Sequence, residues 1–232
     1  MEIKTFKQFL IEAPLGIAYH GTPYEKAAQQ ILKDGVLKPN LRKNGGNLQP
    51  MEGQTYFTTN LSYALIHGLG ANMVGHKIND NIITGGEYGY IFVVDNSKMK
   101  NHIPDEDIVG EIARDIIDDE DSYNFTEDEI EDVIDLIHKS FNNYMEEDYE
   151  RELEESPYER FINHEYEFFA YVGKFILNKA SKRLIIRFRQ NADQYSHSGD
   201  TPIKEAYKFK KKDSEFLEKD GSNFKQYATK IR

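Results

Sequence analysis

The chain contains no cysteine, and this absence excludes disulfide bonds, thiolate metal sites and a catalytic cysteine. A location inside a cell or inside a particle is therefore expected. The sequence also lacks an apolar run of the roughly 20 residues needed to cross a bilayer, so no membrane partner is expected. The N-terminal segment has no continuous apolar core of the kind found in secretory signals, which argues against export by that route.

The charge of the chain is negative and unevenly spread. The net charge of −11 over 232 residues argues against general nucleic-acid binding. The stretch from Asp105 to Glu159 is intensely acidic, while the region beyond Lys174 is rich in lysine and arginine. Any nucleic-acid contact is therefore expected to be local. The length suits one domain with an insertion, or at most two small domains.

The first expected elements are a short buried strand and a helix. The apolar run LGIAY predicts the strand, and the helical spacing after it predicts a helix over residues 23–33. The sequence TPYE reads as a capping box, with Thr22 as the N-cap, proline at the first helical position and Glu25 reaching back to the cap. His20 is thus expected at the corner between strand and helix.

Further strands and helices alternate along the chain. After a loop with the sequence NGGNLQPMEGQ, the stretch QTYFTT at residues 54–59 predicts a strand that leads into a helix near Asn60. The most continuous strand pattern is YGYIFVVD at residues 88–95. Later strands are expected at EYEFFAYV, residues 165–172, and RLIIRFR, residues 183–189. This is a mixed α/β pattern of the α+β kind.

The acidic region keeps isoleucine, valine and leucine at helical spacing. It also has a capping box at Thr126 and Glu129. These features predict two or three amphipathic helices inserted between strands, over about residues 97–160. Their charge is interpreted as a solvated face, with a negative patch that guides a basic partner as the alternative.

The last part of the chain is more polar. The sequence SPYE at residues 156–159 places proline at a first helical position and predicts a short helix before His164. Residues 191–232 are rich in turn-forming and basic residues, which predicts a weakly ordered C-terminal tail with one edge strand near IKEAYKF.

The N-terminal sequence MEIKTFKQFLIEAP has apolar residues spaced for one face of a short helix. It closely resembles the capsid-targeting peptide on internal head proteins of T-even-type myoviruses, which the prohead protease removes after a glutamate. The resemblance implies cleavage after Glu12 and a mature chain from Ala13. It also implies packaging in the interior of the virion head and later delivery to the host cytoplasm. The alternative is an ordinary N-terminal helix packed on the domain.

Three further segments form a set: YHGT at the end of the first strand, TYFTTNLSYA at the second strand and its helix, and HEYEFFAY at a late strand. In this order they resemble the ADP-ribosyltransferase superfamily, in its branch with a His, Tyr, Glu triad that includes diphtheria toxin and the poly(ADP-ribose) polymerases. The resemblance implies a split β-sandwich with flanking helices over residues 13–190, interrupted by the acidic helical insertion. It also implies NAD as substrate and no metal.

The resemblance implies roles for the first two segments. His20 would bond the ribose hydroxyls of NAD, and the bare backbone of Gly21, followed by Thr22, would approach the nicotinamide amide. Tyr56 would stack on the nicotinamide face. The family has a second aromatic residue eleven positions later, where this chain has His67, which could still stack.

Weaker candidates lie nearby. Ser62 is near the place of a serine that bonds the nicotinamide amide, although helix capping near Asn60 accounts for this stretch equally well. The loop before the second strand takes the place of the family's donor-covering loop, which makes Asn47 and Gln49 candidates for contacts on the adenosine side.

The resemblance places the catalytic glutamate at Glu165, where the carboxylate would stabilise positive charge that grows on the ribose as nicotinamide leaves. Glu167 is expected to share a face with Glu165, because side chains alternate along a strand. Glu167 would then orient or deprotonate the nucleophile, or itself be the catalytic glutamate.

Taken together, these features predict a phage-encoded mono-ADP-ribosyltransferase that is packaged with the genome and modifies a host protein or nucleic acid. Two alternatives stay open. The first is an NAD glycohydrolase of the same fold, and the second is a non-catalytic internal head protein that binds DNA or a host protein.

Overall fold

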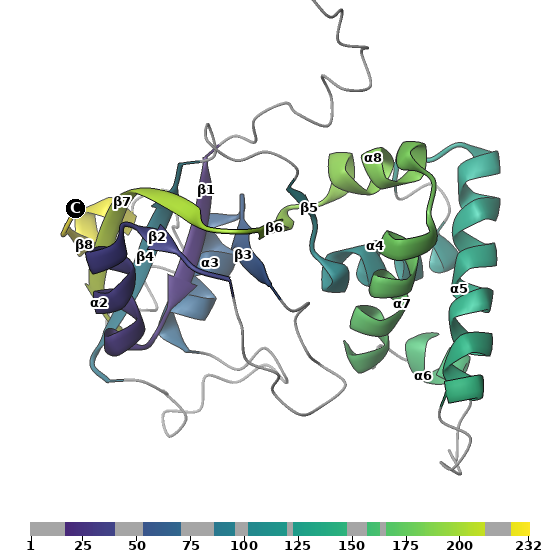
Figure 1. Ribbon diagram of the computed structural model, residues 1–232, viewed down its shortest axis with the longest axis horizontal. Helices are drawn as coiled ribbons and strands as arrows, with labels where there is room; N and C mark the ends of the chain where they lie inside the picture. Colours follow the sequence, from purple (N-terminus) through teal and green to yellow (C-terminus); the bar gives the residue numbers. More distant parts are fainter. Residues whose placement is uncertain are drawn as a thin grey trace, which may run out of the picture. The chain divides into compact units, whose positions relative to one another are not determined.

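The computed structural model describes residues 17–39, 53–70, 86–95, 102–119, 123–147, 157–162, 166–211 and 224–232. Its chain divides into two compact units. The sheet unit comprises the described residues within 1–40, 53–102 and 196–232, and the helical unit those within 103–195. The described secondary structure is a mixture of helices with antiparallel strands, which confirms the α+β class (Figure 1).

The elements of the sheet unit are β1 (Ala18–Thr22), α2 (Glu25–Asp34), β2 (Val36–Leu37), β3 (Gln54–Thr58), α3 (Leu61–Leu69), β4 (Tyr88–Val94), the end of β6 (Gln194–Ser198), β7 (Thr201–Lys210), α10 (Phe224–Tyr227) and β8 (Ala228–Lys230). The strand order is β2-β7-β4-β1-β3-β6, with β8 paired to β7. The predicted strands at the positions of β1, β3 and β4 and the predicted helices at α2 and α3 are confirmed.

Strand alternation divides the β4 side chains between the two faces of the sheet. Ile91 and Val93 belong to a buried cluster with the α3 residues Ala64, Leu65 and Leu69. Tyr90 and Phe92, also buried, alternate with them and take the opposite face. The sheet unit therefore has α3 packed on one face of the strands that carry the expected site.

The described residues of the C-terminal segment form regular elements and are not a weakly ordered tail. Residues 201–210 form β7, which pairs antiparallel with β4 from Tyr88↔Lys210 to Val94↔Ile203 and with β2 at Val36↔Pro202. The strand expected near IKEAYKF is confirmed as β7, but it is not an edge strand, because it has neighbours on both sides. The side chains of Ile203, Ala206 and Phe209 on β7 are buried, and polar side chains lie between them along the strand.

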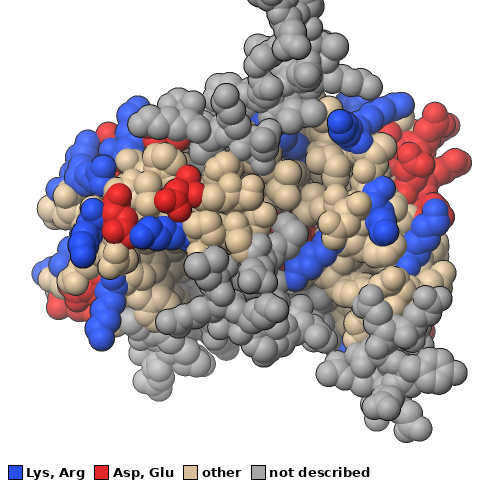
Figure 2. Space-filling model, in the orientation of Figure 1, with Lys and Arg blue, Asp and Glu red and all other residues tan. Residues whose placement is uncertain are grey.

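The helical unit contains β5 (Ile103–Pro104), α4 (Glu106–Asp118), α5 (Glu127–Glu147), α6 (Pro157–Ile162), α7 (Tyr166–Lys179) and α8 (Lys182–Asn191). The predicted amphipathic helices in the acidic region are confirmed as α4, α5 and α6. The exposed face of α5 carries Glu127, Asp128, Glu131, Asp132 and Asp135, and Figure 2 shows acidic side chains gathered over this helix.

The two late strands predicted at residues 165–172 and 183–189 are wrong, because the described residues 166–172 lie in helix α7 and residues 183–189 in helix α8. Helix α7 crosses α4 at very short range. A Cβ added to Gly110 would lie 2.1 Å from the Phe169 carbonyl oxygen, and one added to Gly173 would lie 1.8 Å from the Glu106 carbonyl oxygen. The two glycines allow this backbone approach, which buries Phe168 and Phe169 in the unit.

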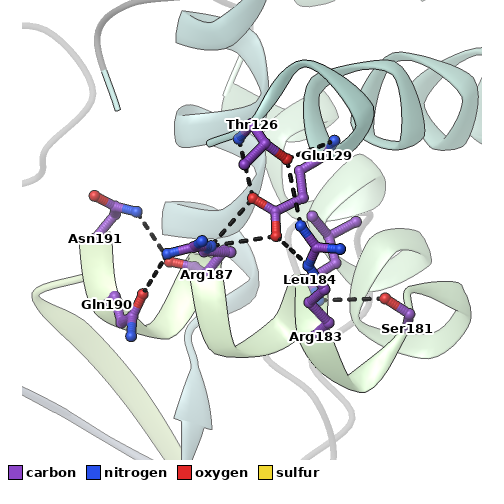
Figure 3. Close-up of polar contacts among 8 residues, drawn as sticks. All are labelled: Thr126, Glu129, Ser181, Arg183, Leu184, Arg187, Gln190 and Asn191. Carbon is purple, nitrogen blue, oxygen red and sulfur yellow. Dashed lines mark hydrogen bonds and ion pairs between the residues drawn. The ribbon is translucent and has the colours of Figure 1, made fainter. Parts of the chain in front are cut away.

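A buried carboxylate links α5 to α8 (Figure 3). Glu129 accepts a hydrogen bond from the Thr126 amide at 3.0 Å, and its own amide donates to the Thr126 hydroxyl at 3.4 Å, which confirms the predicted capping box. The Arg183 and Arg187 side chains donate to its two oxygens at 2.6 and 3.1 Å. Burial alone would raise the pKa of Glu129, but the Thr126 amide and the two arginines lower it overall.

We predict that Glu129→Gln lowers the free energy of unfolding by about 1.5–3 kcal/mol, the usual contribution of hydrogen bonds to a charged group. Because the folded-state pKa lies below the unfolded value near 4.5, the charge of Glu129 stabilises the fold above that pH and the contribution is lost as the pH falls. Urea denaturation at pH 7 and below 4 measures both effects. The exposed Glu131→Gln, on the same helix, is the control and should be nearly neutral; equal effects of the two variants would contradict the prediction.

Candidate functional site

His20 lies at the centre of β1, not at the corner after it. Its Nδ1 is 2.9 Å from the backbone carbonyl oxygen of Tyr56 on β3. A carbonyl only accepts hydrogen bonds, so Nδ1 carries the proton. Burial lowers the pKa of His20, while the bond to Tyr56 opposes this shift. The neutral ring therefore has its lone pair on Nε2, where it can accept a hydrogen bond.

Strand β1 is held differently by its two neighbours. It pairs with β4 along its whole length, from Ala18↔Val94 to Thr22↔Tyr90. With β3, the register of the described residues consists of Tyr19↔Thr58. Beyond that pair, the His20 ring reaches the β3 backbone at Tyr56. The histidine thus bridges two strands at the point where their ladder of paired residues stops.

Gly21 is covered by helix α3. A Cβ added to Gly21 would lie 1.9 Å from the Ala64 carbonyl oxygen and 2.7 Å from the Gly68 amide nitrogen. Backbone atoms cannot give way as a flexible side chain would, so this position requires glycine for packing. The expected approach of a ligand to the Gly21 backbone stays a prediction, and the requirement for glycine has a second cause that the sequence did not reveal.

We predict that Gly21→Ala destabilises the sheet unit by about 1–3 kcal/mol or more, because the methyl group forces α3 away from β1. The midpoint of thermal unfolding should fall by roughly 2–4 °C for each kcal/mol in a chain of this size. Ser62→Ala, at an exposed position in the first turn of α3, serves as the control. An unchanged midpoint for Gly21→Ala would show that α3 can move without cost.

Tyr56 and His67 lie on the two elements that flank β1. Tyr56 is half-buried on β3, and its backbone carbonyl accepts the hydrogen bond from His20. His67 lies in the last turn of α3, with its ring edge-on to Tyr63 at 4.8 Å between ring centroids. His20 acts electrostatically on His67. The structure therefore brings His20, Tyr56 and His67 into one region of the sheet unit.

The structure contradicts the capping role expected for Thr22 and confirms helix capping at Asn60, while the ligand roles expected for Thr22 and Ser62 stay predictions. Thr22 is the buried last residue of β1, and its hydroxyl accepts from the Tyr24 amide at 3.4 Å. The N-cap of α2 is Tyr24, without a side-chain cap bond, so the capping box predicted at Thr22 and Glu25 is wrong. Asn60 caps α3 by accepting from the Tyr63 amide at 3.2 Å, and Ser62 is exposed one position into the helix.

Neither of the two expected catalytic glutamates lies on a described strand. Glu165 lies outside the described residues. Glu167 is the second residue of α7, in the helical unit, and its side chain is not described. Residues two apart in a helix do not share a face, so the argument that a strand aligns Glu165 with Glu167 fails.

Strand β6 was missed by the sequence analysis. It is the neighbour of β3 on the side away from β1, and the Thr55 hydroxyl donates to the Gly199 carbonyl at 3.1 Å. Ser196 on β6 is fully buried, and its hydroxyl has no hydrogen-bond partner among the described residues. Gly199, with φ of 120°, forms the turn between β6 and β7. This glycine, followed by Asp200, was the available turn signal in a stretch interpreted as a tail, although β6 and β7 are not neighbours in the sheet.

Other expectations fall outside the described residues. These are the leader peptide with its cleavage after Glu12 and the loop residues Asn47 and Gln49. Within the described residues, no group of three or more histidine or acidic side chains could hold a metal ion. Among the described helices, none is both long and apolar enough to cross a membrane.

Comparisons with known proteins give no relative. No family model matches the chain, and neither the curated proteins nor the solved structures contain a match.

Proposed function

We propose that the chain is an NAD-consuming mono-ADP-ribosyltransferase whose donor site is built on β1, β3 and α3. The observation that carries the proposal is the state of His20. Its Nδ1 is committed to the Tyr56 carbonyl, and burial keeps the ring neutral. The remaining nitrogen is an acceptor at a fixed position, which suits a ribose hydroxyl donor.

The proposed chemistry is the transfer of ADP-ribose from NAD to an acceptor. The bond from the ribose C1′ to nicotinamide breaks as positive charge grows on the ribose. A carboxylate close to the ribose would stabilise that charge more than it stabilises the ground state. Glu165 is the proposed carboxylate, with Glu167 as the alternative. Tyr56 is the proposed stacking partner of the nicotinamide ring.

The proposed setting follows from the N-terminal resemblance. The chain would be packaged in a virion head, trimmed by the prohead protease after Glu12 and delivered to the host cytoplasm. A host protein or nucleic acid would be the acceptor. A single transfer of ADP-ribose to the acceptor is proposed.

The test measures nicotinamide release and label transfer when the full chain is incubated with labelled NAD and bacterial extract. We predict that His20→Ala weakens NAD binding about tenfold, the equivalent of one lost hydrogen bond of about 1.4 kcal/mol. Glu165→Gln should slow transfer while NAD still binds. The control is His138→Ala, whose ring stacks on Tyr158 in the helical unit.

The outcomes separate the candidate functions. Label in a macromolecule that depends on His20 and Glu165 supports the transferase. Free ADP-ribose as the main product, even with extract present, favours an NAD glycohydrolase. No NAD binding, seen as an unchanged melting temperature at high NAD concentration, rejects both enzymes and favours a packaged binding protein.

A further inference from the structure

The described residues of the two units carry charge of opposite sign. In the sheet unit ten of them are basic and six acidic, whereas in the helical unit nine are basic and eighteen acidic. The positive excess of the sheet unit comes from residues 201–211 and 224–232, which hold seven basic residues and one acidic residue, Glu205. The net charge of −11 of the whole chain therefore conceals a local concentration of positive charge.

These basic residues lie on β7, on β8 and on the short helix α10 that precedes β8. Strands β7 and β8 pair antiparallel, with Tyr207 opposite Lys230 and Lys208 opposite Thr229. Among the described strands, β8 has β7 as its one neighbour, so β8 forms an edge of the sheet. Figure 2 shows basic side chains gathered over the end of the molecule that carries these strands. We define the basic edge as the exposed and half-buried basic residues of the three elements: Lys204, Lys208, Lys210, Lys225, Lys230 and Arg232.

Most of this charge is not neutralised by acidic neighbours. The Glu205 carboxylate accepts a hydrogen bond from Lys230 at 2.9 Å and lies 3.8 Å from the ammonium nitrogen of Lys225, so one carboxylate faces two ammonium groups. Lys204 and Lys210 are exposed on β7, and neither forms an ion pair within the described part of the chain. The basic edge therefore has ammonium groups available for an external anion.

Tyrosine rings lie against two of the lysines. The ammonium nitrogen of Lys208 is 3.7 Å from the centre of the Tyr88 ring on β4, and that of Lys225 is 5.4 Å from the centre of the Tyr207 ring. The face of an aromatic ring attracts a cation but does not cancel its charge. These two ammonium groups are thus held close to the sheet while their positive charge is kept.

The kind and spacing of the basic residues favour a partner with repeated negative charges. Five of the six are lysines, which act as flexible point charges, whereas planar recognition of a single carboxylate group is typical of arginine. Lys204 and Lys210 are six residues apart on one strand, or about 20 Å. A DNA duplex carries one negative charge for about every 1.7 Å of its axis, so it presents phosphates along the whole of this length.

We propose that the basic edge binds the phosphate backbone of nucleic acid without preference for sequence. Its ammonium groups replace condensed counterions along the backbone, and the release of these counterions drives binding. Affinity of this kind is weak at physiological salt, with a Kd of about 10⁻⁴–10⁻⁶ M. The inference goes beyond the proposed function and does not depend on it, because neither NAD nor the transfer step takes part in this binding.

The experiment titrates the full chain into a fluorescently labelled DNA duplex of mixed sequence and records the anisotropy at about 50 to 200 mM sodium chloride. If three ammonium groups contact phosphates, the logarithm of the binding constant should fall against the logarithm of the salt concentration with a slope of about −2.7. The affinity should then drop about 40-fold over this range.

The test variant combines Lys204→Gln with Lys210→Gln. The salt slope should become less steep by about one for each lysine, and the affinity at the lowest salt concentration should fall about tenfold or more. Lys210→Gln alone should give half the change in slope. The matched control combines Lys179→Gln with Lys182→Gln, which removes two exposed lysines of the helical unit and should leave the slope unchanged. Thermal unfolding of each variant checks that the fold is intact.

The outcomes decide the inference. A slope that the β7 variant reduces and the control variant does not supports it. Absence of binding at the lowest salt concentration overturns it, as does an equal loss of affinity in both double variants, because binding would then depend on net charge alone. Displacement of the chain from DNA by a smaller charge equivalent of polyglutamate would assign the basic edge to an acidic polypeptide and reject nucleic acid as the partner. Nicotinamide release is measured separately, so failure here leaves the proposed function intact.

Discussion

The packing of α3 against Gly21 is the constraint on which the candidate site depends. The backbone atoms of Ala64 and Gly68 approach the Gly21 Cα more closely than any side chain would permit. This contact sets the distance between β1 and α3, and so the surroundings of His20 and His67. Burial lowers the pKa of His20 and of His67.

Close backbone contact at glycine residues also determines the packing of the helical unit. Gly110 and Gly173 let α4 and α7 cross with backbones in contact, and the large aromatic residues of α7 fill the space to either side. The many acidic residues contribute mainly to the solvated side of α5. On this helix Glu129 is buried, and its charge is matched by arginines from another helix. One buried acidic residue therefore has a structural role that its many exposed neighbours lack.

Local patterns were sufficient to predict β1, α2, β3, α3 and β4. The strand at residues 88–95 has a continuous apolar run, and α3 has a capping residue at Asn60 and a left-handed glycine at Gly70 to end it. The errors lie where tertiary packing overrides propensity. The aromatic and β-branched residues of α7 favour a strand in isolation, yet they are buried on several sides of a helix. Helix α8 begins after its N-cap Ser181 and buries Leu184 and Phe188 on one face.

The tertiary contacts of the candidate site were likewise not predictable from local sequence patterns. His20, Tyr56 and His67 could be assigned to neighbouring elements from sequence order. The bond from His20 to the Tyr56 backbone could not, because a main-chain acceptor has no sequence signal. The burial of Ser196 depends on the pairing of β6 with β3, strands separated by more than a hundred residues. Such long-range pairing leaves only a turn signal at Gly199 in the sequence.

The sheet unit is assembled from segments at both ends of the chain, and this has a consequence for biosynthesis. Strand β4 pairs with β1 on one side and with β7 on the other, and β7 follows β4 in the sequence only after all the helices from α4 to α8. These helices form a continuous stretch and can collapse as they emerge from the ribosome. The early strands must therefore wait, with one edge of β4 unpaired, until the whole helical unit and β7 have been synthesised, so the sheet unit completes its folding after the helical unit has emerged.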